Sequence, residues 1–152
     1  MKYWLIKSEP DVYSIENLKS DKKTCWDGVR NYQARNTMRD DMKKGDMVIF
    51  YHSRVAPMAA VGVCEVVKEG YPDHTQFDPK DKHHDPKADP DDPRWYMVDV
   101  KYRRTFKRPV TLTEMRDVKA LEELPLLRKG MRLSVQPMTK KHFDTICKLG
   151  DG

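Results

Sequence analysis

The chain has 152 residues, of which 38% are hydrophobic and 35% are charged, and its mean hydropathy is -0.84. This length accommodates one domain with a sizeable core and is short for two, so we expect a single domain over residues 1–152. The chain contains no run of about 18 apolar residues, and its first residues are too polar for a signal peptide. We therefore expect no membrane association, and a cytoplasmic protein, or a nuclear one in a eukaryote.

The formal net charge of +5 and the isoelectric point near 9.0 favour a polyanionic partner, because Lys and Arg at phosphates release condensed counterions. An excess of this size also occurs for solubility alone, so charge by itself does not decide the matter. The three cysteines, Cys25, Cys64 and Cys147, lack the paired spacings of zinc sites and disulfide frameworks. We expect reduced thiols and no bound cofactor.

The first third of the chain contains one β-prone run and one helical pattern. Residues 2–7 predict a strand that ends before Pro10, since proline restricts the residue that precedes it. Ser14 is a suitable cap for a short turn of helix. Between Tyr32 and Met42 apolar residues recur at helical spacing, which predicts a helix closed by Gly45. The buried positions of that helix are Ala34, Met38 and Met42.

Three further β-prone runs follow. Residues 46–53 and 59–67 are dense in β-branched and aromatic residues and are joined by a linker that contains Pro57. From residue 95 to 106 the side chains alternate, which predicts a long, half-exposed strand. Its apolar face would carry Tyr96, Val98, Val100 and Tyr102, and its polar face Asp99, Lys101 and Arg103.

The C-terminal third is predicted to hold two helices around a brief strand at residues 133–135. Thr111 and Glu114 have capping-box spacing and open a helix with Leu112, Met115 and Val118 inward. Thr139 caps a last helix, ending before Gly150, whose buried residues are Phe143, Ile146 and Cys147. The elements do not alternate strictly enough for a doubly wound sheet. The sequence therefore predicts an α+β fold with a bent antiparallel sheet or partial barrel and flanking helices.

Residues 71–94 are rich in Asp, Pro, His and Lys and almost free of apolar side chains, so we expect a polar surface loop. Because the segment lacks apolar anchors, we also expect residues 78–92 to be dispensable for the fold and for ligand binding. Its residue types bind metals elsewhere, but they have no fixed spacing, and we predict no metal site. They are His74, Asp78, Asp81, His83, His84, Asp85, Asp89, Asp91 and Asp92.

Four segments together resemble the EVE domain family of the PUA-like superfamily, and the resemblance spans nearly the whole chain. The segments are WLIKSEP at residues 4–10, WDGVRNYQARN at 26–36, GD at 45–46 with FYHS at 50–53, and RLSVQP at 132–137. The run PRWYMVDV at 93–100 is also similar. The resemblance implies a PUA-like, β-barrel-like fold close to those of YTH and ASCH domains. It also implies a cleft for a flipped, modified base: modified cytosine in DNA for EVE domains, and modified adenine in RNA for relatives. It does not imply catalysis.

Trp26 is the residue that we predict to stack on such a base, because it lies in a segment without apolar periodicity and offers a flat indole face. The amides of Asn31 and Gln33 can meet a Watson–Crick edge with paired donors and acceptors. The alternative is that Trp26 packs in the core beneath a loop.

Polar residues also lie at the ends of two predicted strands. If those ends meet in the fold, the polar residues line one opening of the cleft. Ordinary polar strand ends are the alternative. With the residues that the resemblance adds, the predicted base pocket comprises Lys7, Ser8, Glu9, Trp26, Val29, Arg30, Asn31, Gln33, His52, Ser53, Arg132 and Ser134. Phosphate contacts are predicted for Arg35, Arg39, Lys101, Arg103 and Arg104, although a solvated basic face explains them nearly as well.

The sequence thus predicts a non-catalytic module that binds nucleic acid carrying a modified base, with no catalytic residue, metal or cofactor. One alternative is a nucleotide-processing hydrolase that uses His52 or the His- and Asp-rich loop. Another is an adaptor that holds a small molecule or a peptide. Cys25 as a nucleophile is a weaker possibility, since nothing near it in the sequence supplies a base. The sequence alone does not distinguish DNA from RNA and does not indicate the oligomeric state.

Overall fold

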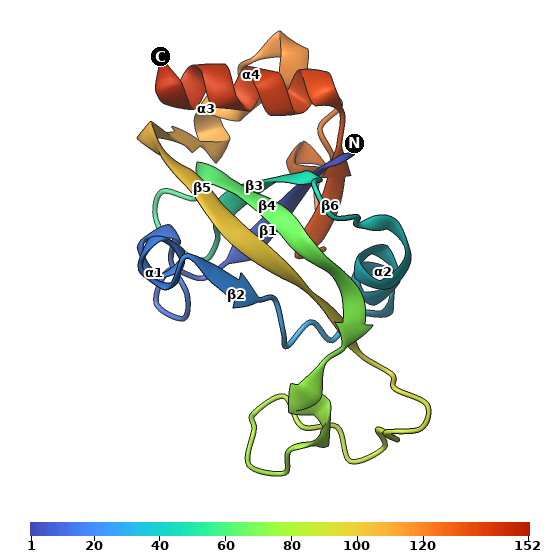
Figure 1. The fold of residues 1–152 in the computed structure, drawn as a ribbon. Helices are drawn as coiled ribbons and strands as arrows, with labels where there is room; N and C mark the ends of the chain where they lie inside the picture. Colours follow the sequence, from blue (N-terminus) through green and yellow to red (C-terminus); the bar gives the residue numbers. More distant parts are fainter.

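The computed structural model describes all 152 residues and contains one open six-stranded sheet with the strand order β2-β5-β4-β3-β1-β6 (Figure 1). The strands are β1 (Tyr3–Ser8), β2 (Lys23–Cys25), β3 (Met47–His52), β4 (Ala59–Pro72), β5 (Tyr96–Thr111) and β6 (Val135–Met138). The helices are α1 (Ile15–Asp21), α2 (Tyr32–Asn36), α3 (Leu112–Arg116) and α4 (Lys140–Asp151). This is the predicted α+β fold, with a bent sheet and helices around it.

The sheet differs from the predicted antiparallel one in a single pairing, because β1 and β3 run parallel. All other neighbouring strands are antiparallel. A parallel pair needs a long crossover, and here α1, β2 and α2 lie between the two strands along the chain. The parallel pairing brings the C-terminal ends of β1 and β3 to the same edge, with Ser8 beside His52.

Both faces of the sheet are buried, each in its own apolar cluster. Trp4 and Ile6 of β1 face a cluster that includes Leu18 of α1. Leu5, between them, faces a second cluster with Ile146 of α4. In Figure 1, α4 covers the sheet from above, whereas α1 and α2 lie at either side below it. The central strands therefore read as continuous apolar runs rather than as alternating ones.

The predicted helix caps are confirmed, since each side chain accepts a hydrogen bond from the backbone N–H three residues further on. The caps are Ser14, Thr111 and Thr139. The predicted capping box at α3 is only half formed, because the carboxylate of Glu114 pairs with Arg108 instead of returning to Thr111. Val118 lies beyond the end of α3. The last helix continues through Gly150 to Asp151.

Several predicted boundaries are corrected by tertiary contacts. The predicted helix over residues 32–42 is α-helical only to Asn36, and a π-helical turn (Thr37–Asp41) follows. The N–H of Met42 closes that turn on the carbonyl of Thr37, so Gly45 turns the chain towards β3 and does not cap the helix. Strands β4 and β5 are longer than predicted because they pair with each other over nearly their whole length. Strand β6 starts at Val135, where the predicted strand ended.

The polar segment between β4 and β5 projects from the body as a lobe, at the bottom of Figure 1. Its root is buried, which the lack of apolar residues did not predict: Asp73, Thr75 and Gln76 are at most 3% exposed. The amide of Gln76 donates to the carbonyl oxygens of Asp73 and Trp95, and its oxygen accepts from the N–H of Trp95. A polar network thus anchors the lobe, together with the buried ring of Trp95, which stacks on Tyr32. None of the helices has the length and apolar composition needed to cross a bilayer.

Candidate nucleic-acid interface

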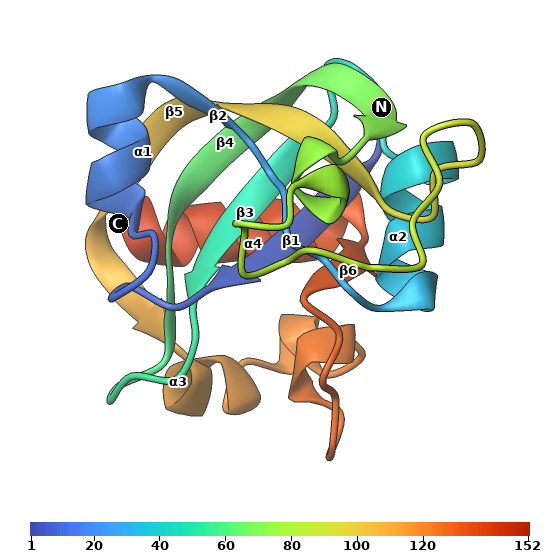
Figure 2. The ribbon, with the colours of Figure 1, turned by 90° about the horizontal axis from the view of Figure 1, so that it is seen from below.

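A cavity of about 830 Å³ opens where β1 ends, between the chain that follows β2 and residues 80–83 of the lobe. In Figure 2 the lobe lies across this end of the molecule, in front of the sheet. We call this space the first cavity. Its lining consists of Lys7, Ser8, Glu9, Val12, Tyr13, Thr24, Cys25, Trp26, Asp27, Gly28, Val29, Arg30, Lys80, Asp81, Lys82, His83 and Ser134.

Trp26 is half-buried and lies between the core and the first cavity. Its backbone N–H donates to the carbonyl of Val98, which extends the pairing of β2 with β5 by one residue. The indole meets the ring of Phe50 edge-on, at 5.6 Å between centroids, and that of Tyr13 at 6.1 Å. One part of Trp26 therefore packs against the core, while another part lines the cavity.

Asp27 is the half-buried carboxyl of the first cavity, and the sequence analysis did not select it. The only hydrogen bond to its carboxylate within the chain is a long one from the thiol of Cys25, at 4.0 Å. Burial raises the pKa of Asp27, and the negative charge of Asp73 raises it further. A carboxyl that is partly dehydrated and makes no ion pair is available to accept hydrogen bonds from a ligand.

Gly28, next in the chain, permits a close approach between this segment and the lobe. Its φ of 78° lies in the left-handed region, and its N–H donates to Asp73 at 2.8 Å. A Cβ at this position would lie 2.6 Å from the imidazole of His83. Only glycine satisfies both demands, so this position determines how near His83 comes to the first cavity.

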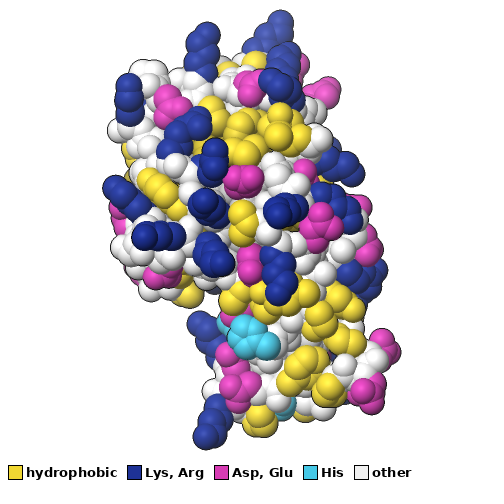
Figure 3. Space-filling model, viewed as in Figure 1, with side chains coloured by type: hydrophobic (Ala, Val, Ile, Leu, Met, Phe, Trp, Pro, Cys, Tyr) yellow, Lys and Arg dark blue, Asp and Glu magenta, His cyan; other side chains and the backbone are white.

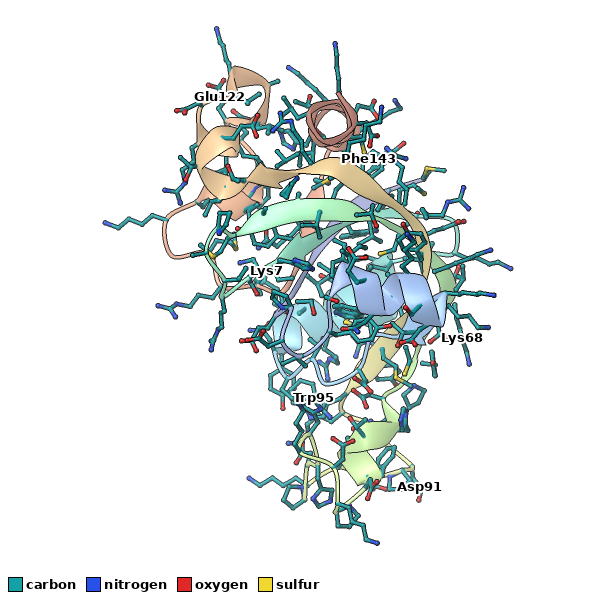
Figure 4. The ribbon with its side chains drawn as sticks, turned by 90° about the vertical axis from the view of Figure 1, so that its left-hand side faces the viewer. Lys7, Lys68, Asp91, Trp95, Glu122 and Phe143 are labelled. Carbon is teal, nitrogen blue, oxygen red and sulfur yellow. The ribbon has the colours of Figure 1, made fainter.

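Arg30 holds the lobe wall in place and is not free to contact a ligand with its whole guanidinium group. It donates to the carbonyl of His83 at 2.7 and 3.1 Å, to Asp73 at 3.1 Å and to Thr75 at 3.0 Å. The guanidinium also lies over the ring of Trp95, 5.4 Å from its centroid. Figure 4 shows Trp95 where the lobe joins the body.

The carboxylate of Asp73 is the centre of this anchor. Burial by itself would raise its pKa, but hydrogen bonds from Thr75, Gly28 and Arg30 outweigh that effect and lower it. Asp73 is fully buried and remains ionised at neutral pH. The contact between lobe and body is therefore an ion pair of Arg30 with Asp73, supported by hydrogen bonds to Asp73 from Gly28 and Thr75.

Seven of the twelve residues predicted for the base pocket line the first cavity: Lys7, Ser8, Glu9, Trp26, Val29, Arg30 and Ser134. Five do not: Asn31, Gln33, His52, Ser53 and Arg132. The oxygen of Asn31 caps α2 by accepting from the N–H of Ala34. Nε2 of His52 accepts from the N–H of Ile15 at the start of α1, and burial lowers the pKa of His52. Gln33 and Arg132 are exposed to solvent.

The sequence analysis missed the lobe residues 80–83 because nothing in the sequence indicates that a polar loop folds back on the segment after β2. It also missed Tyr13, which lies in a stretch without a clear apolar period. Asp27 could have been found, since it adjoins Trp26 in the same motif.

Most of the basic residues predicted to track phosphates have partners within the chain. Arg39 pairs with Asp40 at 2.8 Å, Arg103 with Glu65 at 3.1 Å and Arg104 with Asp151 at 2.9 Å. Arg35 donates to the carbonyl of Arg94, and Lys101 is exposed without an ion pair. Figure 3 shows Lys and Arg mixed with Asp and Glu over this face of the body. No three His, Cys, Asp or Glu side chains converge in an arrangement that would hold a metal ion.

The open bent sheet and the aromatic and polar cavity at its edge define an α+β domain of the PUA-like class. The chain belongs to the EVE domain family, whose model matches residues 2–149. It is 46% identical to thymocyte nuclear protein 1 of Mus musculus, over 97% of this chain and 73% of the mouse protein. It is also similar to the human THYN1 protein, crystallised in complex with DNA that contains 5-methylcytosine. That match has a TM-score of 0.92 and 41% identity and covers 100% of this chain and 99% of that chain.

The implied similarity to ASCH domains is confirmed at the level of the fold. An ASCH protein from Zymomonas mobilis has a TM-score of 0.56 with 11% identity, over 98% of this chain and 99% of that chain. At this identity the similarity concerns the fold alone.

Proposed function

We propose that this domain binds DNA and takes one 5-methylcytosine, rotated out of the duplex, into the first cavity. The observation that carries the proposal is the similarity, over the whole chain, to the human protein that was crystallised with DNA containing 5-methylcytosine. The chemistry of the first cavity supports it independently.

The size and the aromatic wall of the first cavity suit an extruded base. Ligand pockets typically measure roughly 300–1,000 Å³, and this one measures about 830 Å³. Trp26 and Tyr13 contribute aromatic rings to the lining. Stacking of a base on such a ring is worth about 1–3 kcal/mol, which helps to offset the cost of removing the base from the duplex.

Asp27 supplies the hydrogen-bonding group that favours cytosine. A carboxylate accepts from the exocyclic amino group of cytosine, whereas the corresponding position of thymine is itself an acceptor. Within the chain Asp27 accepts only the long hydrogen bond from the thiol of Cys25, so an amino group of a ligand would be its first strong donor. The aliphatic side chain of Val29 in the same lining offers an apolar contact for the 5-methyl group.

The hydrolase alternative finds no support at His52. Its Nε2 is occupied by the N–H of Ile15, and its side chain does not line the first cavity. A general base needs a free nitrogen within reach of the substrate.

The test is fluorescence anisotropy with labelled duplexes that contain either one 5-methylcytosine or one cytosine at the same position, beside RNA with one methylated adenine. We expect the methylated duplex to bind most tightly. Asp27→Ala removes a hydrogen bond to a charged acceptor, worth about 1.5–3 kcal/mol, and should weaken binding of that duplex by about one to two orders of magnitude.

The matched control is Asp91→Ala, at the far end of the lobe in Figure 4, which should bind like the parent protein. Equal affinity for both duplexes, or tighter binding of the methylated RNA, would contradict the proposal.

A further inference from the structure

A second cavity of about 540 Å³ lies between the C-terminal ends of β1 and β3, the end of α3 and residues 128–131. Lys7 lines both cavities and so stands between them. Every charged residue in the lining of the second cavity is basic: Lys7, Arg116, Arg128 and Lys129. The first cavity, in contrast, also contains Glu9, Asp27 and Asp81.

The basic residues of the second cavity are not neutralised within the chain. Arg116, Arg128 and Lys129 make no ion pair, whereas Arg39, Arg103, Arg104 and Arg108 each have a carboxylate partner. The only contact of the Lys7 ammonium group is a long hydrogen bond, at 3.4 Å, to the carbonyl of Met131. Positively charged groups around a concave surface with apolar walls concentrate the electric field there and attract an anion.

Tyr51 adds a fixed neutral donor to this surface. The residue is 1% exposed and its ring packs in the second apolar cluster, yet it belongs to the lining of the second cavity. Its hydroxyl makes no hydrogen bond within the chain. Burial raises the pKa of Tyr51 to about 12, even though the nearby Arg116 acts in the opposite direction. The hydroxyl therefore stays protonated and can donate to an anion.

The two cavities lie on either side of Lys7, and this position suggests one ligand for both. In a nucleic-acid strand each base is joined through its sugar to the phosphates on either side. A base held in the first cavity therefore brings its own backbone close to Lys7. The walls of the second cavity that are not charged include Leu126 and Met131, against which a sugar can pack.

We propose that the second cavity binds the phosphodiester backbone next to the base held in the first cavity, through Arg116, Arg128, Lys129 and the hydroxyl of Tyr51. The inference rests on the proposed function. The residues of the second cavity, and not the exposed residues of β5, would then be the main phosphate contacts. Arg103 and Arg104 of β5 already pair with carboxylates of the chain.

The experiment compares two double variants of the whole chain. Arg116→Gln with Arg128→Gln removes two unpaired cations of the second cavity, both exposed at the surface, so the fold should persist. The matched control, Arg39→Gln with Arg103→Gln, removes the same charge from two exposed arginines that have carboxylate partners. Affinity for the methylated and unmethylated duplexes is measured between about 50 and about 200 mM salt.

For the variant of the second cavity we expect affinity for both duplexes to fall by a common factor of about ten or more. The slope of log affinity against log salt should become shallower by about two, one unit for each lost phosphate contact. The control should keep nearly the slope of the parent protein. Tyr51→Phe deletes only the hydroxyl. It should lower the affinity for both duplexes by a smaller common factor and leave the slope of log affinity against log salt unchanged.

Two results would overturn the inference while leaving the proposed function intact. One is a variant of the second cavity with the affinity and slope of the parent. The other is a loss of preference for the methylated duplex, which would assign these residues to reading the base. If the parent protein itself binds no DNA, the proposed function fails and the inference fails with it.

Discussion

Asp27 and Asp73 lie close together, yet their surroundings give the two carboxylates opposite properties. Asp73 is fully buried and accepts hydrogen bonds from Thr75, Gly28 and Arg30, so its charged form is stabilised. Asp27 is half-buried without such donors, so its charged form is disfavoured. One aspartate stabilises the fold, and the other costs stability and remains available for a ligand.

This difference predicts opposite effects on thermal stability. Because the pKa of Asp27 is raised in the folded state, its ionisation lowers the free energy of unfolding at neutral pH, and that loss disappears as pH falls through the folded pKa. Asp27→Asn should therefore raise the melting temperature at pH 7 and have little effect near pH 4. Scanning calorimetry at both pH values measures this, and a lower melting temperature at pH 7 would contradict it.

Asp73→Asn should act in the other direction. The pKa of Asp73 is lowered, so its contribution to stability is present above the unfolded pKa of about 3.9 and is lost as pH falls through the folded value. Loss of satisfied hydrogen bonds at a buried site costs about 1–3 kcal/mol, or roughly 2–12 °C in melting temperature at neutral pH for a chain of this size. An unchanged melting temperature would show that the anchor contributes nothing to folding.

Trp26 should affect binding and stability together, since it both packs against Phe50 and lines the first cavity. Trp26→Ala should weaken binding of methylated DNA by about one to two orders of magnitude. It should also lower the free energy of unfolding by less than the roughly 3–5 kcal/mol of a fully buried aromatic residue. Trp26→Phe should lose less of both. Anisotropy at a temperature where each variant is folded separates the effects, and unchanged affinity for Trp26→Ala would remove its stacking role.

At the scale of elements, the lobe contributes a wall to the first cavity, and hydrogen bonds hold that wall to the body. Arg30 reaches His83, and the indole N–H of Trp95 donates to Asp85 at 2.8 Å. Because residues 80–83 line the first cavity, we now predict that they are needed for ligand binding, whereas their composition had suggested a dispensable surface loop. Deleting residues 78–92 should leave the sheet folded and impair ligand binding.

Arg30→Lys tests how the wall is held. Lysine keeps the charge but cannot donate to His83, Asp73 and Thr75 together, because it lacks the planar fork of donors. Hydrogen exchange should become faster at residues 80–83 and remain unchanged in β3, and affinity for methylated DNA should fall. Arg108→Lys, at an arginine whose guanidinium donates two hydrogen bonds to Glu114 and none to the lobe, is the matched control. Unchanged exchange at residues 80–83 would show that other contacts hold the wall.

At the scale of the whole molecule, the net charge of +5 should act on the DNA backbone but not on the base. Binding to an oligonucleotide should therefore weaken as salt rises, because displaced counterions are then less favourably released. Binding to the free methylated nucleoside, which has no phosphate, should hardly change. Titrations of both ligands over the same salt series measure this, and equal salt dependence would mean that the charge is there for solubility alone.

The sequence by itself determined the elements and the family of this protein. Helix caps such as Ser14 and Thr139 are local interactions, and the apolar runs at residues 46–53 and 59–67 identify strands wherever they pair. The WDGVRN motif likewise located Trp26, Val29 and Arg30 beside the first cavity, because residues adjacent in the chain stay adjacent in the fold.

Only the tertiary structure decided what those side chains do. Asn31, Arg30 and His52 were predicted to contact a ligand, and all three hold other parts of the chain. A polar side chain bonds to whichever donor or acceptor folding brings nearest, and the sequence does not show which one that is. Three features bring together segments that are distant in sequence. They are the parallel pairing of β1 with β3, the contact of the lobe with Gly28, and the grouping of unpaired cations with Lys7 around the second cavity. These contacts form only when both apolar clusters pack against the sheet, so no local sequence pattern predicts them.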